Sequence, residues 1–184
     1  MNLALTTSEH AQHSGKVQQQ GLTIRVSSGT GIGRTRLSAF DAALRDAGVA
    51  NFNLIRLSSV IPPGSDVLEV DGSEQLAGGY GDMLYCVYAD AYASTPNEQA
   101  WAGVAWSSRD DQSGAGLFVE HHASSRKSLE HDLRASLDDL SVGRGGGYHH
   151  GGSVIASVEC HDHPVCAVVV ATYKRSGWIT HEQR

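Results

Sequence analysis

Two adjacent serines, Ser58 and Ser59, stand where a short apolar segment meets a turn. The segment Asn53–Leu57 alternates and is rich in Leu and Ile, which predicts a short buried strand. The Pro-Pro-Gly run at 62–64 ends any strand, because two prolines remove two backbone donors and glycine favours a turn. A serine hydroxyl held in such a bend can attack the preceding carbonyl, if that carbonyl is activated. The pair can equally be ordinary polar residues at a strand end, because serine is common in turns.

The wider sequence around these serines adds a more specific interpretation. The run from Asn53 to Gly64, NLIRLSSVIPPG, closely resembles the self-cleavage site of the pyruvoyl-dependent arginine decarboxylases, where the chain breaks between two serines. Upstream, Leu37–Gly48 resembles the first helix of that family, and downstream Gly116–Glu120 resembles the strand that carries its catalytic glutamate. The resemblance extends from Leu22 to Tyr173, which is most of the chain.

The resemblance implies a cofactor made from the chain itself. Ser59 would attack the carbonyl of Ser58 and be converted into a covalent pyruvoyl group, leaving a β chain, Met1–Ser58, and an α chain that begins at the former Ser59. Amino acid decarboxylation needs such a carbonyl, because side chains offer no electron sink for the carbanion. The substrate amine would form a Schiff base with it, and the implied reaction converts L-arginine into agmatine and carbon dioxide.

The same resemblance assigns roles to two further residues near the serines. Glu120 matches the catalytic acid, and its apolar neighbours would help it to hold a proton for the carbanion near neutral pH. Asn53 matches an asparagine whose amide could polarise the Ser58 carbonyl or hold an oxyanion. Without the family, Glu120 is an exposed glutamate at a strand end, and Asn53 is an asparagine that satisfies a turn.

Substrate recognition is also implied by the family pattern. Asp41 matches the aspartate that binds the substrate guanidinium, and a bidentate pair would distinguish arginine from shorter diamino acids. Leu37, one helical turn earlier, would line the same pocket, and backbone groups near Ser58 and Val60 are expected to contact the substrate. Taken alone, Asp41 is a solvated helix residue.

Composition limits the function classes that fit. The chain has 184 residues, enough for one domain, with 40% hydrophobic and 18% charged residues, as expected of a soluble protein. A net charge of −6 without a basic stripe argues against a nucleic-acid partner. No apolar run approaches the roughly 20 residues of a membrane span, so no membrane partner is expected. Three cysteines at unremarkable spacing favour reduced thiols and a cytoplasmic location.

Hydrophobic patterning predicts one domain of α/β class, of the segregated α+β type. We expect a disordered tail at 1–20, the domain at 21–175 and a C-terminal tail at 176–184. The predicted helices are Arg36–Asp46 and Arg126–Leu140, and the predicted strands are Leu22–Val26, Asn53–Leu57, Asp66–Val70, Met83–Ala93, Gln99–Ser107, Gly116–His122, Val154–Cys160 and Val165–Tyr173.

The connections carry predictions of their own. Ser27–Arg34 and Gly143–Gly152 are rich in glycine and are predicted to be loops. Thr95–Asn97 contains a turn signal and predicts that Met83–Ala93 and Gln99–Ser107 form a hairpin. The strands should form two packed, mainly antiparallel sheets with a helix on each outer face. The family resemblance implies the same four-layer αββα sandwich, assembled as a homotrimer of αβ units with active sites between subunits.

Four alternatives remain open. The run Cys160–Cys166, CHDHPVC, could bind zinc, although its spacing fits no standard finger and a turn explains it more simply; no metal is expected. The glycines at 29–33 could suggest a phosphate loop, but the lysine of a P-loop is missing. The chain could decarboxylate another basic amino acid. It could also be an uncleaved, non-enzymatic trimeric binding protein.

Overall fold

The computed structural model describes residues 21–178, so the tail predicted at 1–20 and the last six residues of the chain lie outside the described part. The elements in chain order are β1 (Thr23–Ile32), α1 (Arg36–Asp46), β2 (Asn53–Arg56), β3 (Val60–Ile61), β4 (Asp66–Glu69), β5 (Met83–Ala93), β6 (Gln99–Arg109), β7 (Gly116–Ala123), α2 (Arg126–Gly143), β8 (Tyr148–Glu159) and β9 (Val165–Ser176).

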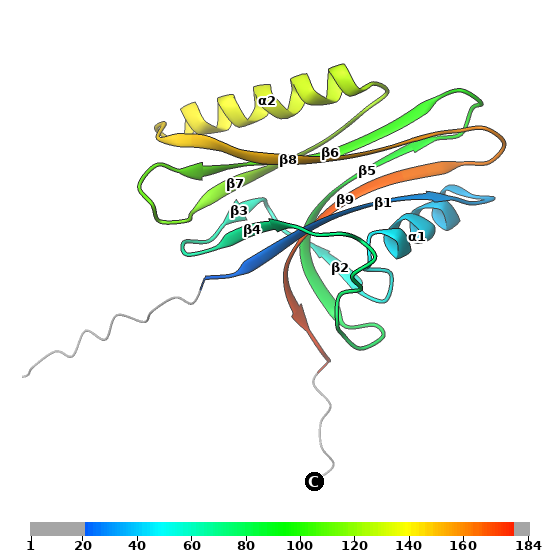
Figure 1. The fold of residues 1–184 in the computed structure, drawn as a ribbon, viewed down its shortest axis with the longest axis horizontal. Helices are drawn as coiled ribbons and strands as arrows, with labels where there is room; N and C mark the ends of the chain where they lie inside the picture. The colour runs from blue at the N-terminus through cyan, green and yellow to red at the C-terminus, as the bar shows by residue number, and fades with distance from the viewer. Residues whose placement is uncertain (1–20, 179–184) are drawn as a thin grey trace, which may run out of the picture.

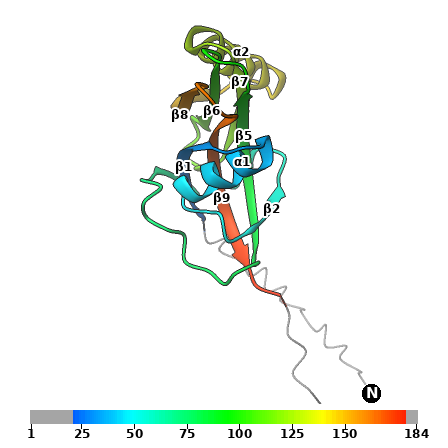
Figure 2. The same ribbon diagram turned by 90° about the vertical axis from the view of Figure 1, so that its right-hand side faces the viewer.

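The strands form two sheets that pack face to face, with one helix on each outer face (Figure 1). The first sheet has the order β2-β5-β9-β1-β4 and the second has the order β3-β7-β6-β8. Most neighbouring strands are antiparallel, whereas β4 beside β1 and β2 beside β5 are parallel. Figure 2 shows the same layers edge on, with α2 at one end and α1 against the sheet of β1 and β9. The predicted αββα sandwich is therefore confirmed.

Alternating side chains divide the core into three layers. Odd-numbered residues of β9, such as Val169 and Ala171, face the second sheet in the central layer, and even-numbered ones, such as Val168 and Val170, face α1. Because the first part of β9 is buried on both faces, every side chain from Val165 to Ala171 is apolar. The third layer lies under α2, where Leu129, Leu133 and Leu137 at helical spacing are buried against the second sheet.

Both helices begin where the sequence predicts. The Thr35 hydroxyl caps α1 by accepting a hydrogen bond from the Ser38 amide, and the Ser38 hydroxyl accepts one from the Thr35 amide in return. Ser125 caps α2 in the same way through the Ser128 amide. The α2 helix runs three residues further than predicted, to Gly143.

The hairpin predicted between β5 and β6 is wrong. These strands belong to different sheets, with β5 pairing with β2 and β9 and β6 pairing with β7 and β8. The Thr95–Asn97 turn is present, and Asn97 has a positive φ of 69°, but it carries the chain from one sheet to the other. A turn signal fixes reversal of direction and does not fix which strand becomes the hydrogen-bonded neighbour.

Two glycine-rich segments predicted as loops belong to strands. Residues 27–32 continue β1 because α1 lies directly on it: a Cβ at Gly29 would sit 2.3 Å from the Ala43 carbonyl oxygen, and one at Gly31 would sit 2.2 Å from that of Ala39. These glycines therefore permit close helix–strand packing and not a turn. Likewise β8 starts at Tyr148, inside the predicted loop, and only the glycines at 145–147, all with positive φ, form the turn.

The Cys160–Cys166 segment is the turn between β8 and β9. The Cys160 thiol lies in the layer between the sheets and donates to the His163 carbonyl oxygen at 3.3 Å, whereas Cys166 faces α1 on the opposite side of its sheet. Burial raises the pKa of Cys166, as it does for Cys86, to about 12. The two thiols of this segment therefore point to different layers and do not converge on a shared ion.

Candidate active site

The bond between Ser58 and Ser59 lies where the chain crosses from one sheet to the other. Before it, β2 belongs to the first sheet, and the Leu57 amide donates to the Cys86 carbonyl oxygen of β5 at 2.9 Å. After it, β3 belongs to the second sheet, and the Ser59 carbonyl oxygen accepts from the Phe118 amide of β7 at 2.8 Å. The two serines therefore span the gap between two anchored strands (Figure 1).

The backbone at Ser59 is in an unusual conformation. Its φ is 60°, in the left-handed region that costs a residue with a side chain of order 1 kcal/mol or more. Ser59 is half-buried, and Ser58 beside it is exposed. The anchored strands on both sides hold the bend in place, so the strain is built into this peptide and is not shared along a flexible loop.

The side chain of Ser59 is directed at Glu120. Its hydroxyl Oγ donates a short hydrogen bond to Oε1 of Glu120, which is half-buried on β7. A carboxylate in contact with a serine hydroxyl can take its proton, which is the arrangement that activates a weak oxygen nucleophile. The structure thus brings together two of the residues that the sequence predicts, although they are 61 positions apart in the chain.

A shallow hollow of about 340 Å³ opens beside this pair, between β7 and α2. Its lining residues are Ser59, Phe118, Val119, Glu120, His121, Ser136, Asp139 and Leu140. The ring Nε2 of His121 lies 2.7 Å from the Ser136 hydroxyl and ties β7 to the helix that forms the far wall. Sequence patterning gave no signal for the α2 residues, because Ser136 and Asp139 are ordinary residues of a solvated helix face.

The other predicted site residues lie apart from this hollow within one chain. Asp41 and Leu37 are on α1, which packs against the outer face of the first sheet (Figure 1). Both are exposed, and Asp41 pairs with Arg45 on the next turn at 3.2 Å. An exposed pair of this kind is worth only about 0.3–0.5 kcal/mol, so Asp41 can exchange it for another cation at little cost.

Asn53 is also separated from the serines of its own chain. Its amide Nδ2 donates to the Gly81 carbonyl oxygen at 2.7 Å, at the start of β2. The rise of an extended strand places its Cα roughly 16 Å from that of Ser58. Val60, in contrast, immediately follows Ser59, and its side chain is 46% exposed. The structure therefore divides the predicted residues into those at the serines and those on α1 or at the start of β2.

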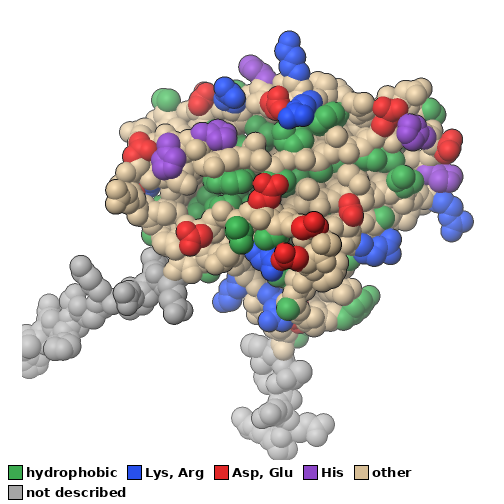
Figure 3. Space-filling model, viewed as in Figure 1, with side chains coloured by type: hydrophobic (Ala, Val, Ile, Leu, Met, Phe, Trp, Pro, Cys, Tyr) green, Lys and Arg blue, Asp and Glu red, His purple; other side chains and the backbone are tan. Residues whose placement is uncertain are grey.

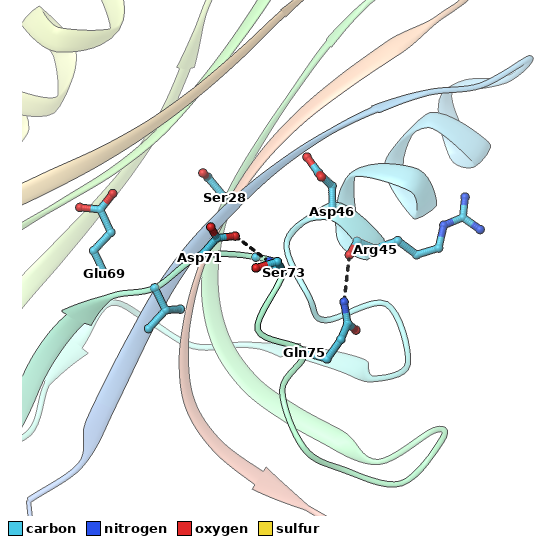
Figure 4. A pocket seen from close by; sticks show the side chains of 9 residues that line it. Ser28, Arg45, Asp46, Glu69, Asp71, Ser73 and Gln75 are labelled. Atoms are coloured by element: carbon cyan, nitrogen blue, oxygen red, sulfur yellow. Dashed lines mark hydrogen bonds between the residues drawn. The ribbon is translucent and has the colours of Figure 1, made fainter.

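A larger hollow of about 620 Å³ lies elsewhere, between the end of α1 and the loop after β4 (Figure 4). Two of its three carboxylates already have partners: Asp46 accepts from the Thr30 amide at 2.8 Å, and Asp71 accepts from the Ser73 amide at 2.8 Å. The bonds from Ser73 hold the pKa of Asp71 below its usual value. This hollow contains none of the residues predicted for the active site.

The surface provides further context for ligands. On the face seen in Figure 3, lysine and arginine side chains are dispersed and acidic side chains lie among them across the middle of the molecule. Neither helix within residues 21–178 combines the length and the apolar character that crossing a bilayer requires.

Comparisons with known proteins agree with the motif. The family model of the pyruvoyl-dependent arginine decarboxylases matches residues 23–173. The pyruvoyl-dependent arginine decarboxylase of Halobacterium salinarum is 46% identical over 97 residues, which cover 53% of this chain and 58% of that protein. That of Methanococcoides burtonii is 35% identical over 99 residues, covering 53% and 54%. The chain thus spans somewhat more than half the length of these curated relatives.

A solved structure of a pyruvoyl-dependent histidine decarboxylase is also similar, with a TM-score of 0.40 and 16% identity over 75% of this chain and 61% of that one. The family model covers the serine pair, the glutamate that contacts it and all of the described strands except the last residues of β9. This protein belongs to the pyruvoyl-dependent arginine decarboxylase family.

Proposed function

We propose that the chain cleaves itself between Ser58 and Ser59 and then decarboxylates L-arginine to agmatine and carbon dioxide. The observation that carries the proposal is the Ser59 hydroxyl on Glu120 at a left-handed bend between two anchored strands. Family membership supports the reaction, and the relatives named above carry it in their names.

In the first step, Ser59 Oγ attacks the carbonyl carbon of Ser58 while Glu120 takes the hydroxyl proton. The peptide C–N bond breaks, which leaves an ester between the two serines and a free amine on Ser59. Loss of the Ser59 Cα proton then breaks its Cβ–O bond and releases Ser58 as a carboxylate. The resulting dehydroalanine takes up water and loses ammonia, so that the α chain begins with a pyruvoyl group.

The residues present fit a pyruvoyl group at position 59. The Phe118 amide holds the Ser59 carbonyl oxygen, and conversion of the Ser59 side chain leaves this hydrogen bond intact, so the new terminus would stay beside Glu120 in the hollow between β7 and α2. When formed, the group supplies a carbonyl that draws electrons from the carbon losing carbon dioxide. Glu120 would hold the proton that this carbon receives.

For substrate recognition we propose that a second copy supplies Asp41, Leu37 and Asn53. Within one chain these residues lie away from Ser59, and Leu37 is 76% exposed, as an apolar residue at a subunit contact would be in an isolated chain. A homotrimer of αβ units would place Asp41 of one copy against the arginine bound at Ser59 of the next. Asp41 would then bind the guanidinium in place of Arg45. The three reduced cysteines support a cytoplasmic location.

Mass spectrometry of two serine variants tests the proposal. Ser59→Ala lacks the nucleophile and is expected to remain one chain with no carbon dioxide release from arginine. Ser58→Ala is the matched control, because it keeps both the Ser59 hydroxyl and the carbonyl that is attacked, and it is expected to be cut. A Ser59→Ala chain that is still cut or still active would remove Ser59 from the mechanism.

Two further measurements distinguish the proposed function from its alternatives. Comparing carbon dioxide release from arginine, lysine, ornithine and histidine identifies the substrate, and a preference for another basic amino acid would overturn the role of Asp41. An unsubstituted chain of full mass, with no terminus that reacts with hydrazine or borohydride, would instead indicate a non-enzymatic binding protein.

A further inference from the structure

We propose that Tyr173 is a positioning residue that keeps position 59 against Glu120, and that turnover depends on it more than self-cleavage does. The inference rests on the proposed function and extends it to a residue on the far sheet. Three features carry it: an irregularity in β9, a hydrogen bond to the residue after Ser59, and a row of packed aromatic rings.

Tyr173 occupies an extra position in the pairing of β9 with β5. Tyr85 pairs with Lys174 and Cys86 with Thr172, so Tyr173 is the inserted residue between two regular pairs. It also lies just beyond Thr172, where the pairing of β9 with β1 begins. Such a bulge re-aims a side chain, and bulges are frequent beside active sites.

The side chain crosses from the first sheet to the start of β3. The Tyr173 hydroxyl donates to the Val60 carbonyl oxygen at 3.2 Å, and the residue is only 9% exposed. The neighbouring Ser59 carbonyl oxygen is held by the Phe118 amide at 2.8 Å. The carbonyl groups of Ser59 and Val60, the first two after the scissile bond, are therefore each held by a hydrogen bond. One comes from β7 of the second sheet and the other from β9 of the first.

The Tyr173 ring is held by a row of aromatic side chains. It packs edge to face on Phe118 with ring centres 6.0 Å apart, and Phe118 packs on Trp106 at 6.1 Å. A Cβ at Gly151 or Gly152 would come within 2.4–2.5 Å of the Trp106 ring, so these glycines of β8 make room for the indole. Contacts of this kind leave the phenol little freedom to turn away from Val60.

The phenol also remains protonated where the enzyme would work. Burial, and then the negative charge of Glu120, raise the pKa of Tyr173 above its ordinary value of 10.0. Below that value the hydroxyl is always available as a donor to the Val60 carbonyl oxygen.

The hydrogen bond should matter most after the chain has been cut. Before cleavage, Ser59 is also tethered through Ser58 and the Leu57 bond to β5. After cleavage, position 59 is a chain end, and chain ends fray unless they are tied down. The Tyr173 hydroxyl then takes over part of the restraint that the peptide bond provided.

The test is Tyr173→Phe, which keeps the ring and removes only the donor. We expect cleavage within a fewfold of the normal rate, kcat for arginine lower by about tenfold, and KM within about twofold, because Tyr173 does not line the substrate hollow. Tyr148→Phe is the matched control. Tyr148 lies at the start of β8, where its hydroxyl is 3.5 Å from the Arg109 guanidinium, and the kinetics of this variant should be normal.

A second measurement separates positioning from folding stability. A fluorinated tyrosine at position 173 keeps the shape of the residue but lowers its pKa, so the donor is lost at high pH. It should add an alkaline decline to the kcat profile that the unmodified enzyme lacks. Normal kcat in Tyr173→Phe, a change in KM alone, or an unaltered pH profile would each overturn the inference. An unsubstituted chain that neither cleaves nor decarboxylates would instead refute the proposed function, and this inference with it.

Discussion

At the scale of single residues, the pair of Ser59 and Glu120 defines the site. The sequence motif predicts both residues, and the structure brings their side chains into contact. The sequence gives no signal for Tyr173, which looks like one more buried residue in a strand of Val and Ala. The reason is physical: a β-bulge is a property of the pairing between two strands, and neither strand encodes it alone.

Glu120→Gln tests the proton donor at this scale. The amide keeps the shape of the side chain but cannot hold or take a proton, so we expect kcat for arginine to fall by about 10²–10⁴-fold. Because Glu120 is also proposed to take the Ser59 proton in self-cleavage, steady-state carbon dioxide release is divided by the cleaved fraction, which intact mass measures. Glu69→Gln, on β4 away from Ser59, serves as the control. Unchanged turnover in the Glu120 variant would assign the proton to another group.

At the scale of the elements, the glycines of β1 set the position of α1. Sequence patterning predicts both helices and most strands, because capping residues and hydrophobic spacing are local. It fails for residues 27–32 and for the start of β8, where glycine allows a residue or helix from elsewhere in the sequence to pack closely against the strand. It fails for the β5–β6 hairpin because sheet membership depends on the whole core.

Comparing the stability of Gly31→Ala with that of Gly143→Ala tests this interpretation. A Cβ at Gly31 meets the backbone of α1 at 2.2 Å, so the helix must shift, and we expect a loss of about 1–3 kcal/mol in the free energy of unfolding. A Cβ at Gly143, in the last turn of α2, meets no described atom within 4 Å and should be neutral or slightly stabilising. Urea denaturation of uncut Ser59→Ala chains carrying each change gives both values; equal stabilities would contradict the packing role of Gly31.

At the scale of the whole molecule, the site that we propose would be shared between copies. Its two groups of residues lie apart within one chain: Asp41 is on α1, outside the first sheet, and Glu120 is in the second sheet beside Ser59. The exposed Leu37 and Val60 provide apolar surface on each side for such a contact.

Mixing two inactive variants measures this sharing. Asp41→Ala and Glu120→Gln chains are each expected to be nearly inactive alone. If the site combines Asp41 of one copy with Glu120 of another, co-assembly regenerates intact sites, at roughly a quarter of all interfaces for random mixing. Activity of the co-expressed chains, compared with the same chains purified separately, reports the result. No recovery in a mixed oligomer would mean that each chain uses only its own residues.

The crossing at Ser58 also determines what would hold the protein together after the proposed cut. The shorter product contains β1, which lies between β9 and β4 inside the first sheet, together with α1 and β2, whereas everything else belongs to the longer product. Denaturation of the cut form would therefore separate two polypeptides and become a dissociation reaction, so we expect its midpoint to rise with protein concentration beyond any shift seen for the uncut Ser59→Ala chain. Refolding would require each short polypeptide to associate with a long one. The cleavage that creates the cofactor would therefore make unfolding much harder to reverse than in the uncut chain.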